Sequence, residues 1–170
     1  MGTYRRILAA IDLTEEGRAV GERACELARG ADAVVKLLHV LEFVPIEPMS
    51  DSLVPVVQID DQMLTRARRQ LEDLAAALGL PSDAGSVETG NAKSEILRYA
   101  REQHTDLIVI GCRERHGLST LVHRTEDSVL HAAPCDVLAV RVHEPLAASA
   151  RRRAAPDQEV SGPPGGAPPR

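Results

Sequence analysis

The chain has 170 residues, of which 44% are hydrophobic and 26% are charged, so it is long enough for one globular domain with a substantial core. Aromatic residues make up only 2%, with no Trp, which argues against a protein that stacks single-stranded nucleic acid on aromatic side chains. The formal net charge of −5 argues against non-specific binding to DNA, so we expect no nucleic-acid partner.

The cysteine content and the apolar runs bear on the compartment. Cys25, Cys112 and Cys135 are sparse and lack C-x-x-C spacing, which is more typical of a reducing cytoplasm than of a disulfide scaffold. No run approaches the roughly 18 apolar residues of a membrane span. The apolar run near the start of the chain meets Asp12 before it reaches the length of a secretory signal. The sequence therefore predicts a cytoplasmic protein with no membrane partner.

Five apolar segments rich in branched residues are predicted to be strands, and four are nearly continuous in apolar character. Such runs suit strands that are covered on both faces of a sheet. The fifth segment, AGSVET, is weaker than the others. In chain order, the predicted strands cover residues 5–11, 34–40, 84–89, 106–111 and 136–142.

Four helices are predicted between these strands. Thr14 is a candidate N-cap for the first helix, and Gly30 is its expected stop. Gly79 and Pro81 are expected to end the second helix. The predicted helices cover residues 14–29, about 60–78, about 91–103, and a segment that starts near Leu118.

The alternation of strands and helices predicts an α/β fold, an open five-stranded parallel sheet with helices on both faces. In such sheets, ligands bind beyond the carboxyl ends of the strands, near the point where the strand order switches. Asp12, Val40 and Gly111 follow or end three of the predicted strands, so we expect them to converge at that edge.

Two segments fall outside this pattern. Residues 41–58 contain three prolines and form a long connection, which is typical of a lid or an interaction segment. Residues 144–170 are rich in Pro, Gly and Ala and have no apolar period, so a disordered tail is expected. The predicted organisation is one domain over 1–143 followed by this tail.

Three stretches of the chain resemble the universal stress protein family. They are YRRILAAIDLTEEGRAVGERACELAR near the start, VVKLLHV in the predicted second strand, and DLIVIGCRERHGLSTLVHRTEDSVLHAAPCDVLAVRV at the end of the domain. The resemblance covers about 1–143 and implies a five-stranded Rossmann-like fold, a homodimer and a role in survival under stress. It also implies that the last strand, DVLAVRV, pairs with its counterpart in the dimer.

One branch of that family binds ATP through the motif G-x2-G-x9-G-[ST]. On this chain the motif begins at Gly111 and ends at Thr125, but Glu114 and Arg124 occupy the second and third glycine positions. Glycines in such loops let backbone N–H groups approach phosphate oxygens, and a glutamate there adds bulk and repels phosphate. The resemblance therefore implies the branch that lacks the ATP motif.

A compensated phosphate site is the alternative. The guanidinium groups of Arg113 and Arg124 can bind a phosphate directly. Asp12 resembles the family aspartate near the adenine or ribose, but it can equally cap the turn into the first helix. Val40 resembles the residue whose backbone meets adenine, or it is simply the last core residue of its strand. We expect Gly111 to serve the turn from strand to loop in either case.

Other chemistry is not favoured by the sequence. Cys112, which we expect in a loop near several cations, is either a redox-sensitive thiol or an inert small residue. The six histidines show no metal-binding spacing, and His39 is expected to be a hydrogen-bonded structural residue. No G-x-S-x-G, P-loop or S-x-x-K motif occurs, so neither catalytic residues nor an enzyme activity is expected.

These observations predict a non-enzymatic cytoplasmic stress-response protein that acts through dimerisation and protein partners, without a cofactor. The alternative is a switch that depends on ATP or AMP. In that case Asp12, Val40, Gly111, Arg113, Arg124 and Thr125 would form the nucleotide site.

Overall fold

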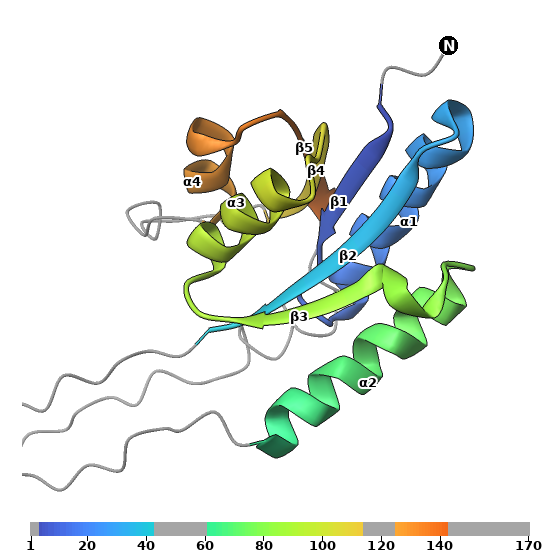
Figure 1. The fold of residues 1–170 in the computed structure, drawn as a ribbon, viewed down its shortest axis with the longest axis vertical. Coiled ribbons are helices and arrows are strands. Elements are labelled where there is room, and N and C mark those ends of the chain that lie inside the picture. Colours follow the sequence, from blue (N-terminus) through green and yellow to red (C-terminus); the bar gives the residue numbers. More distant parts are fainter. Residues whose placement is uncertain (1–3, 43–60, 114–124, 143–170) are drawn as a thin grey trace, which may run out of the picture.

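A computed structural model describes residues 4–42, 61–113 and 125–142 of the chain. Its sheet has five parallel strands in the order β3-β2-β1-β4-β5 (Figure 1), which confirms the predicted fold class. The strands are β1 (Arg6–Ala10), β2 (Val34–Leu41), β3 (Gly85–Thr89), β4 (Leu107–Arg113) and β5 (Asp136–Val142). The helices are α1 (Glu15–Ala31), α2 (Asp61–Ala77), α3 (Ala92–Glu102) and α4 (Thr125–Ala132), and a short 3-10 helix covers Ser82–Ala84.

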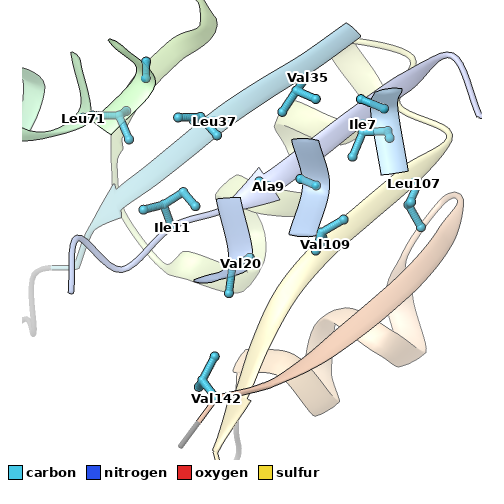
Figure 2. Packing of buried hydrophobic residues seen from close by; sticks show 13 residues of the cluster. Ile7, Ala9, Ile11, Val20, Val35, Leu37, Leu71, Leu107, Val109 and Val142 are labelled. Atoms are coloured by element: carbon cyan, nitrogen blue, oxygen red, sulfur yellow. The ribbon is translucent and has the colours of Figure 1, made fainter. Parts of the chain in front are cut away.

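Side chains alternate between the two faces of the sheet, so each strand contributes to two separate cores. On β1, Ile7 and Ala9 face one core, and Leu8 faces the other. The α1–α2 core, shown in Figure 2, joins one face of the sheet to side chains of α1 and α2 such as Val20 and Leu71. The α3–α4 core joins the other face to Ile96, Leu97 and Ala100 of α3 and Val129 of α4. Both faces of the sheet are therefore covered, as the apolar strands predict.

The ends of α1 illustrate what local sequence determines. Thr14 caps the helix as predicted, because its Oγ1 accepts a hydrogen bond from the Gly17 N–H at 3.3 Å. The predicted stop at Gly30 is wrong, since the helix continues to Ala31. Asp32 ends the helix in the left-handed conformation with φ 54°, and its backbone N–H donates to the Ala28 carbonyl. Aspartate is one of the few residues other than glycine that adopt this conformation readily.

The end of α2 agrees with the sequence. Gly79 follows the helix with φ +71°, a conformation that glycine adopts at no steric cost, and its N–H donates to the Ala76 carbonyl at 3.0 Å. The predicted end of the helix at Gly79 is therefore confirmed.

The largest correction concerns β4, which continues to Arg113 instead of ending at Gly111. Gly111 pairs with Val140, and Cys112 pairs with Arg141. Both residues belong to a strand, so the expectations that Gly111 makes a turn and that Cys112 lies in a loop are wrong. The apolar run predicts that a strand exists. Pairing with β5 extends that strand beyond the apolar run, to Arg113.

Several predictions lie outside the described residues. These are the role of the segment 41–58 beyond Glu42, the start of the last helix near Leu118, and the tail over 144–170. The predicted site residue Arg124 and the motif residue Glu114 also lie outside the described ranges.

Candidate functional site

The candidate site lies at the carboxyl edge of the sheet, where the strand order switches. β1 pairs with β2 on one side and with β4 on the other, and Ala10 at its end is level with Leu38 and Ile110. In an open α/β sheet, connections leave such a point toward opposite faces and create a crevice between the strand ends. The residues that follow β1 and the last residues of β4 therefore lie at the position at which this fold binds ligands.

Asp12 stands at the centre of this edge and is held by the residue that caps α1. Its Oδ1 accepts hydrogen bonds from the backbone N–H of Thr14 at 3.2 Å and from Thr14 Oγ1 at 2.6 Å. Leu13, between them, has φ 54°, an uncommon conformation for a leucine. The carboxylate is thus fixed in a strained turn at the start of the helix, which supports the local role weighed from the sequence.

The backbone that leads to Asp12 is fixed to β2. The Ile11 N–H donates to the Leu38 carbonyl at 2.8 Å, and His39 Nδ1 hydrogen-bonds to the Ile11 carbonyl at 2.7 Å. The structural role predicted for His39 agrees with this contact. Val40 follows on β2, where it is half-buried and packs against the α3–α4 core. Val40 therefore already has a structural role in the core.

Gly111 lies on β4 beneath α1. A Cβ atom at this position would lie 3.2 Å from Val20 Cγ2, which is tighter than most such contacts, and 3.8 Å from Val142 Cγ1. The glycine is explained by the close approach of the helix, which replaces the predicted turn as its structural reason. Arg113, two residues further on, ends β4 opposite Val142.

The remaining motif position, Thr125, is the first residue of α4 and is half-buried. This helix packs against α3 and approaches β4. The structure therefore brings Asp12, Val40, Gly111 and Arg113 to one edge of the sheet and places Thr125 at the start of the helix that follows β4.

Comparison with known proteins identifies the family. The chain matches the model of the universal stress protein family over residues 3–141. It is 36% identical over 143 residues to universal stress protein A homolog 2 of Coxiella burnetii, covering 84% of this chain and 98% of that protein. The chain belongs to the universal stress protein family. It is also 34% identical over 142 residues to homolog 1 of the same organism, covering 83% of this chain and 99% of that protein.

Solved universal stress proteins share the fold. The structure of UspA from Lactobacillus plantarum superposes with a TM-score of 0.63 at 23% identity, covering 81% of this chain and 98% of that chain. A second structure, a universal stress protein in complex with cAMP, superposes with a TM-score of 0.54 at 22% identity, covering 81% and 97%. Membership of this family assigns the chain to the stress-response proteins, which are generally regarded as non-enzymatic.

Two residues of this universal stress protein were missed by reasoning from the sequence. Gly17, in the first turn of α1, lies directly against Asp12, so that a Cβ atom there would overlap Asp12 Oδ1. Glu42 follows β2, and its Oε1 accepts from the Ala92 N–H at 2.8 Å, so it places a carboxylate at the positive end of α3. A glycine inside the first turn of a helix was the available signal for Gly17. Glu42 gave no local signal, since its partner lies 50 positions away.

The thiols and charged groups do not add a second site within the described ranges. Burial raises the pKa of the Cys25 and Cys135 thiols, so both are less reactive than a free cysteine. Cys112 is half-buried on β4. Across residues 4–42, 61–113 and 125–142, no group of three His, Cys, Asp or Glu side chains is arranged to hold a metal ion. In the same ranges, no helix is long and apolar enough to cross a membrane.

Proposed function

We propose that this universal stress protein acts in the cytoplasm by forming a homodimer through β5 and binding protein partners, without enzymatic activity and without tight binding of ATP. The observation that carries the proposal is the character of β5. This strand lies at one edge of the sheet and pairs with β4 along all seven of its residues. Its outer edge offers backbone hydrogen-bonding groups to another strand.

The two edges of the sheet differ in how well they discourage pairing. β3, at the opposite edge, has only five residues, and its Glu88 forms an ion pair with Arg98 at 2.8 Å. Short length and charge are devices that protect an edge strand. β5 is longer and mostly apolar, and its exposed residue Ala139 has a small, uncharged side chain. These differences support β5 as the strand that pairs in a dimer.

The test is sedimentation velocity of the wild type and of Ala139→Lys, with Val34→Lys as the matched control. Ala139 is exposed on β5, whereas Val34 is 60% exposed at the start of β2, away from this edge. We expect a wild-type dimer, a dimeric Val34→Lys and a largely monomeric Ala139→Lys. Val140 is a less selective probe, because it packs against the α1–α2 core. A wild-type monomer, or an Ala139→Lys variant that stays dimeric, would remove β5 from the proposal.

The residues at the glycine positions of the motif support the proposal that ATP does not bind tightly. Glu114 brings a negative charge to a place where the motif holds phosphate, and Arg124 brings bulk. Two like charges about 4 Å apart near a surface repel by roughly 4 kcal/mol before the side chain relaxes. Even about 1.4 kcal/mol of remaining repulsion lowers the affinity tenfold.

A nucleotide-dependent switch is the second candidate, and the arrangement of the carboxyl edge favours it. Asp12, Val40, Gly111 and Arg113 lie at one edge, at the switch point of the strand order. A universal stress protein of similar fold has been solved in complex with cAMP. In this account, Arg113 and Arg124 hold the phosphates that the missing glycines would have held, and Thr125 contributes its hydroxyl.

Isothermal titration with MgATP, AMP and cAMP separates the two candidates. The wild type is compared with the double variant Glu114→Gly, Arg124→Gly. If the wild type gives no heat and the double variant binds ATP, the side chains block the cradle and the partner-binding account stands. Micromolar binding by the wild type would favour the switch instead.

A further inference from the structure

The helix α2 carries three exposed arginines, Arg66, Arg68 and Arg69. One side of this helix lies against β3 and β2 (Figure 1) and packs there through buried residues such as Leu71. No residue that the structure describes forms a hydrogen bond or an ion pair with the three guanidinium groups. Their donors therefore stay available on this side of the molecule.

Arginines on the other helices behave differently. On α1, Arg18 forms an ion pair at 2.9 Å with Glu22, four positions further on. Arg98 on α3 forms ion pairs with three glutamates. Arg69 has the same spacing of four positions to Asp73, but these two side chains form no ion pair, although the structure describes both. The spacing of the charges along the helix therefore does not account for the arginines of α2.

Two of these arginines form a continuous band with a methionine. Met63, Arg66 and Arg69 follow one another at steps of three positions, and side chains at that spacing are neighbours on a helix surface; we call these three residues the α2 band. Met63 is 50% exposed and adds a flexible apolar side chain. Like charges at this spacing repel each other, so a carboxylate bound between the two guanidinium groups would relieve that repulsion.

The charge of the α2 band fits a protein carboxylate better than a membrane or a nucleic acid. Anionic membranes are recognised by clusters of about four to eight Lys or Arg. The band has fewer, and α2 also carries Asp61, Glu72 and Asp73. The formal net charge of −5 further weakens attraction to an extended polyanion. A single carboxylate needs only one guanidinium group, which binds it through two parallel hydrogen bonds.

We propose that the α2 band docks an acidic segment of a protein partner, whose carboxylates bind Arg66 and Arg69 and whose apolar side chain contacts Met63. This inference rests on the proposed function, in which the protein binds protein partners, and it specifies the surface and the chemistry of the partner. The band lies on the helix that packs against β3 and β2, whereas the proposed dimer uses β5 at the opposite edge of the sheet. A dimer can therefore bind a partner at each α2.

Fluorescence anisotropy tests the proposal with the full chain and a fluorescein-labelled peptide of Glu residues around a central Leu. We expect Arg66→Ala and Arg69→Ala each to weaken binding about fivefold, the upper range for an exposed ion pair, and added salt to weaken wild-type binding. Arg68→Ala is the matched control on the same helix. Arg68 lies about 100° around the helix from Arg69 and outside the band, so its loss should leave the affinity unchanged.

Thermal unfolding separates lost binding from lost structure. Arg66→Ala and Arg69→Ala remove the repulsion between the two arginines and introduce a better helix former, so neither melting temperature should fall below that of the wild type. Equal weakening by Arg68→Ala, or equal affinity for the same peptide with Gln in place of Glu, would overturn the band as the docking surface. Absence of peptide binding would do the same, as would binding of phosphatidylserine vesicles instead of the peptide.

Retention of proteins from a cell lysate distinguishes this failure from that of the proposed function. If no peptide binds, and the wild type and the double variant Arg66→Ala, Arg69→Ala retain the same proteins, only the role of α2 is overturned. If no peptide binds and the wild type retains no protein, the binding of protein partners is overturned as well.

Discussion

Leu71 provides the strongest test of how α2 is held on the sheet. Its side chain is 1% exposed, and the other buried residues of α2 are the small Ala67 and Ala75. Its Cγ and Cδ2 atoms lie 3.1 Å from where a Cβ of Gly85 would stand, so the leucine fills the space that this glycine leaves on β3. Leu71 is therefore the fully buried large side chain with which α2 docks, and Leu74 packs against the same core while only partly buried.

Leu71→Ala is expected to cost about 3 kcal/mol of unfolding free energy. Burying a leucine contributes about 1.5–3 kcal/mol, and the cavity left behind raises the usual cost of truncation to about 2–5 kcal/mol. Gly85 has no side chain that can move into the cavity, so we expect little relaxation. At about 2–4 °C per kcal/mol, the melting temperature should fall by about 6–12 °C.

Urea denaturation gives the free energy, and hydrogen exchange shows whether α2 opens first. Met63→Ala is the matched control on the same helix, because Met63 is 50% exposed, and it should change stability by less than about 0.5 kcal/mol. A loss below about 1 kcal/mol for Leu71→Ala, or unchanged exchange in α2, would refute the argument that this side chain docks the helix.

Three further predictions concern charge, capping and thiol reactivity. Lys36 holds the pKa of Asp83 below its ordinary value, so this stabilisation exists above the ordinary pKa and is lost as the pH falls through the folded-state value. Urea unfolding of Asp83→Asn should therefore differ from wild type at pH 7 and converge with it below about pH 4, and a constant gap would contradict this cause. Asn91→Ala removes the cap of α3, which should cost about 1 kcal/mol and speed amide exchange in its first turn; unchanged exchange would exclude the cap. Because burial raises the pKa of Cys25 and Cys135, both thiols should react with iodoacetamide more slowly in the folded protein than in urea, as followed by peptide mass spectrometry, and equal rates would contradict their burial.

The sheet could be predicted because its signals are local. Apolar runs flanked by glycines and caps mark each strand and helix, and Thr14 identifies the start of α1 from its residue type alone. The strand order β3-β2-β1-β4-β5 was not predicted, because alternation by itself indicates only a parallel sheet. Boundaries that depend on a neighbour were missed, as at Arg113, where pairing with Val142 extends β4 beyond its apolar segment.

The candidate site was predictable as a place but not as a set of contacts. The topology brings Asp12, Val40 and Gly111 to one edge, as their positions after or at the ends of the predicted strands indicate. The reason for Gly111, contact with Val20 of α1, depends on a residue about 90 positions away and leaves no local pattern. The contact between Glu42, which follows β2, and the Ala92 N–H at the start of α3 was missed for the same reason. Contacts between segments that are distant in the sequence are therefore the features of the site that could not be predicted.

The central position of β1 also has a consequence for the order in which the chain assembles during synthesis. β1 is made before its partners, and one of them, β4, follows only after the 65 residues that separate it from β2. At about 5–20 residues per second, the ribosome needs about 3–13 s to supply them. During that interval β1 can pair with β2 while its other side remains open. The strands β4 and β5 are therefore the last to be added, and their late arrival completes the edge at which Asp12 and Gly111 lie.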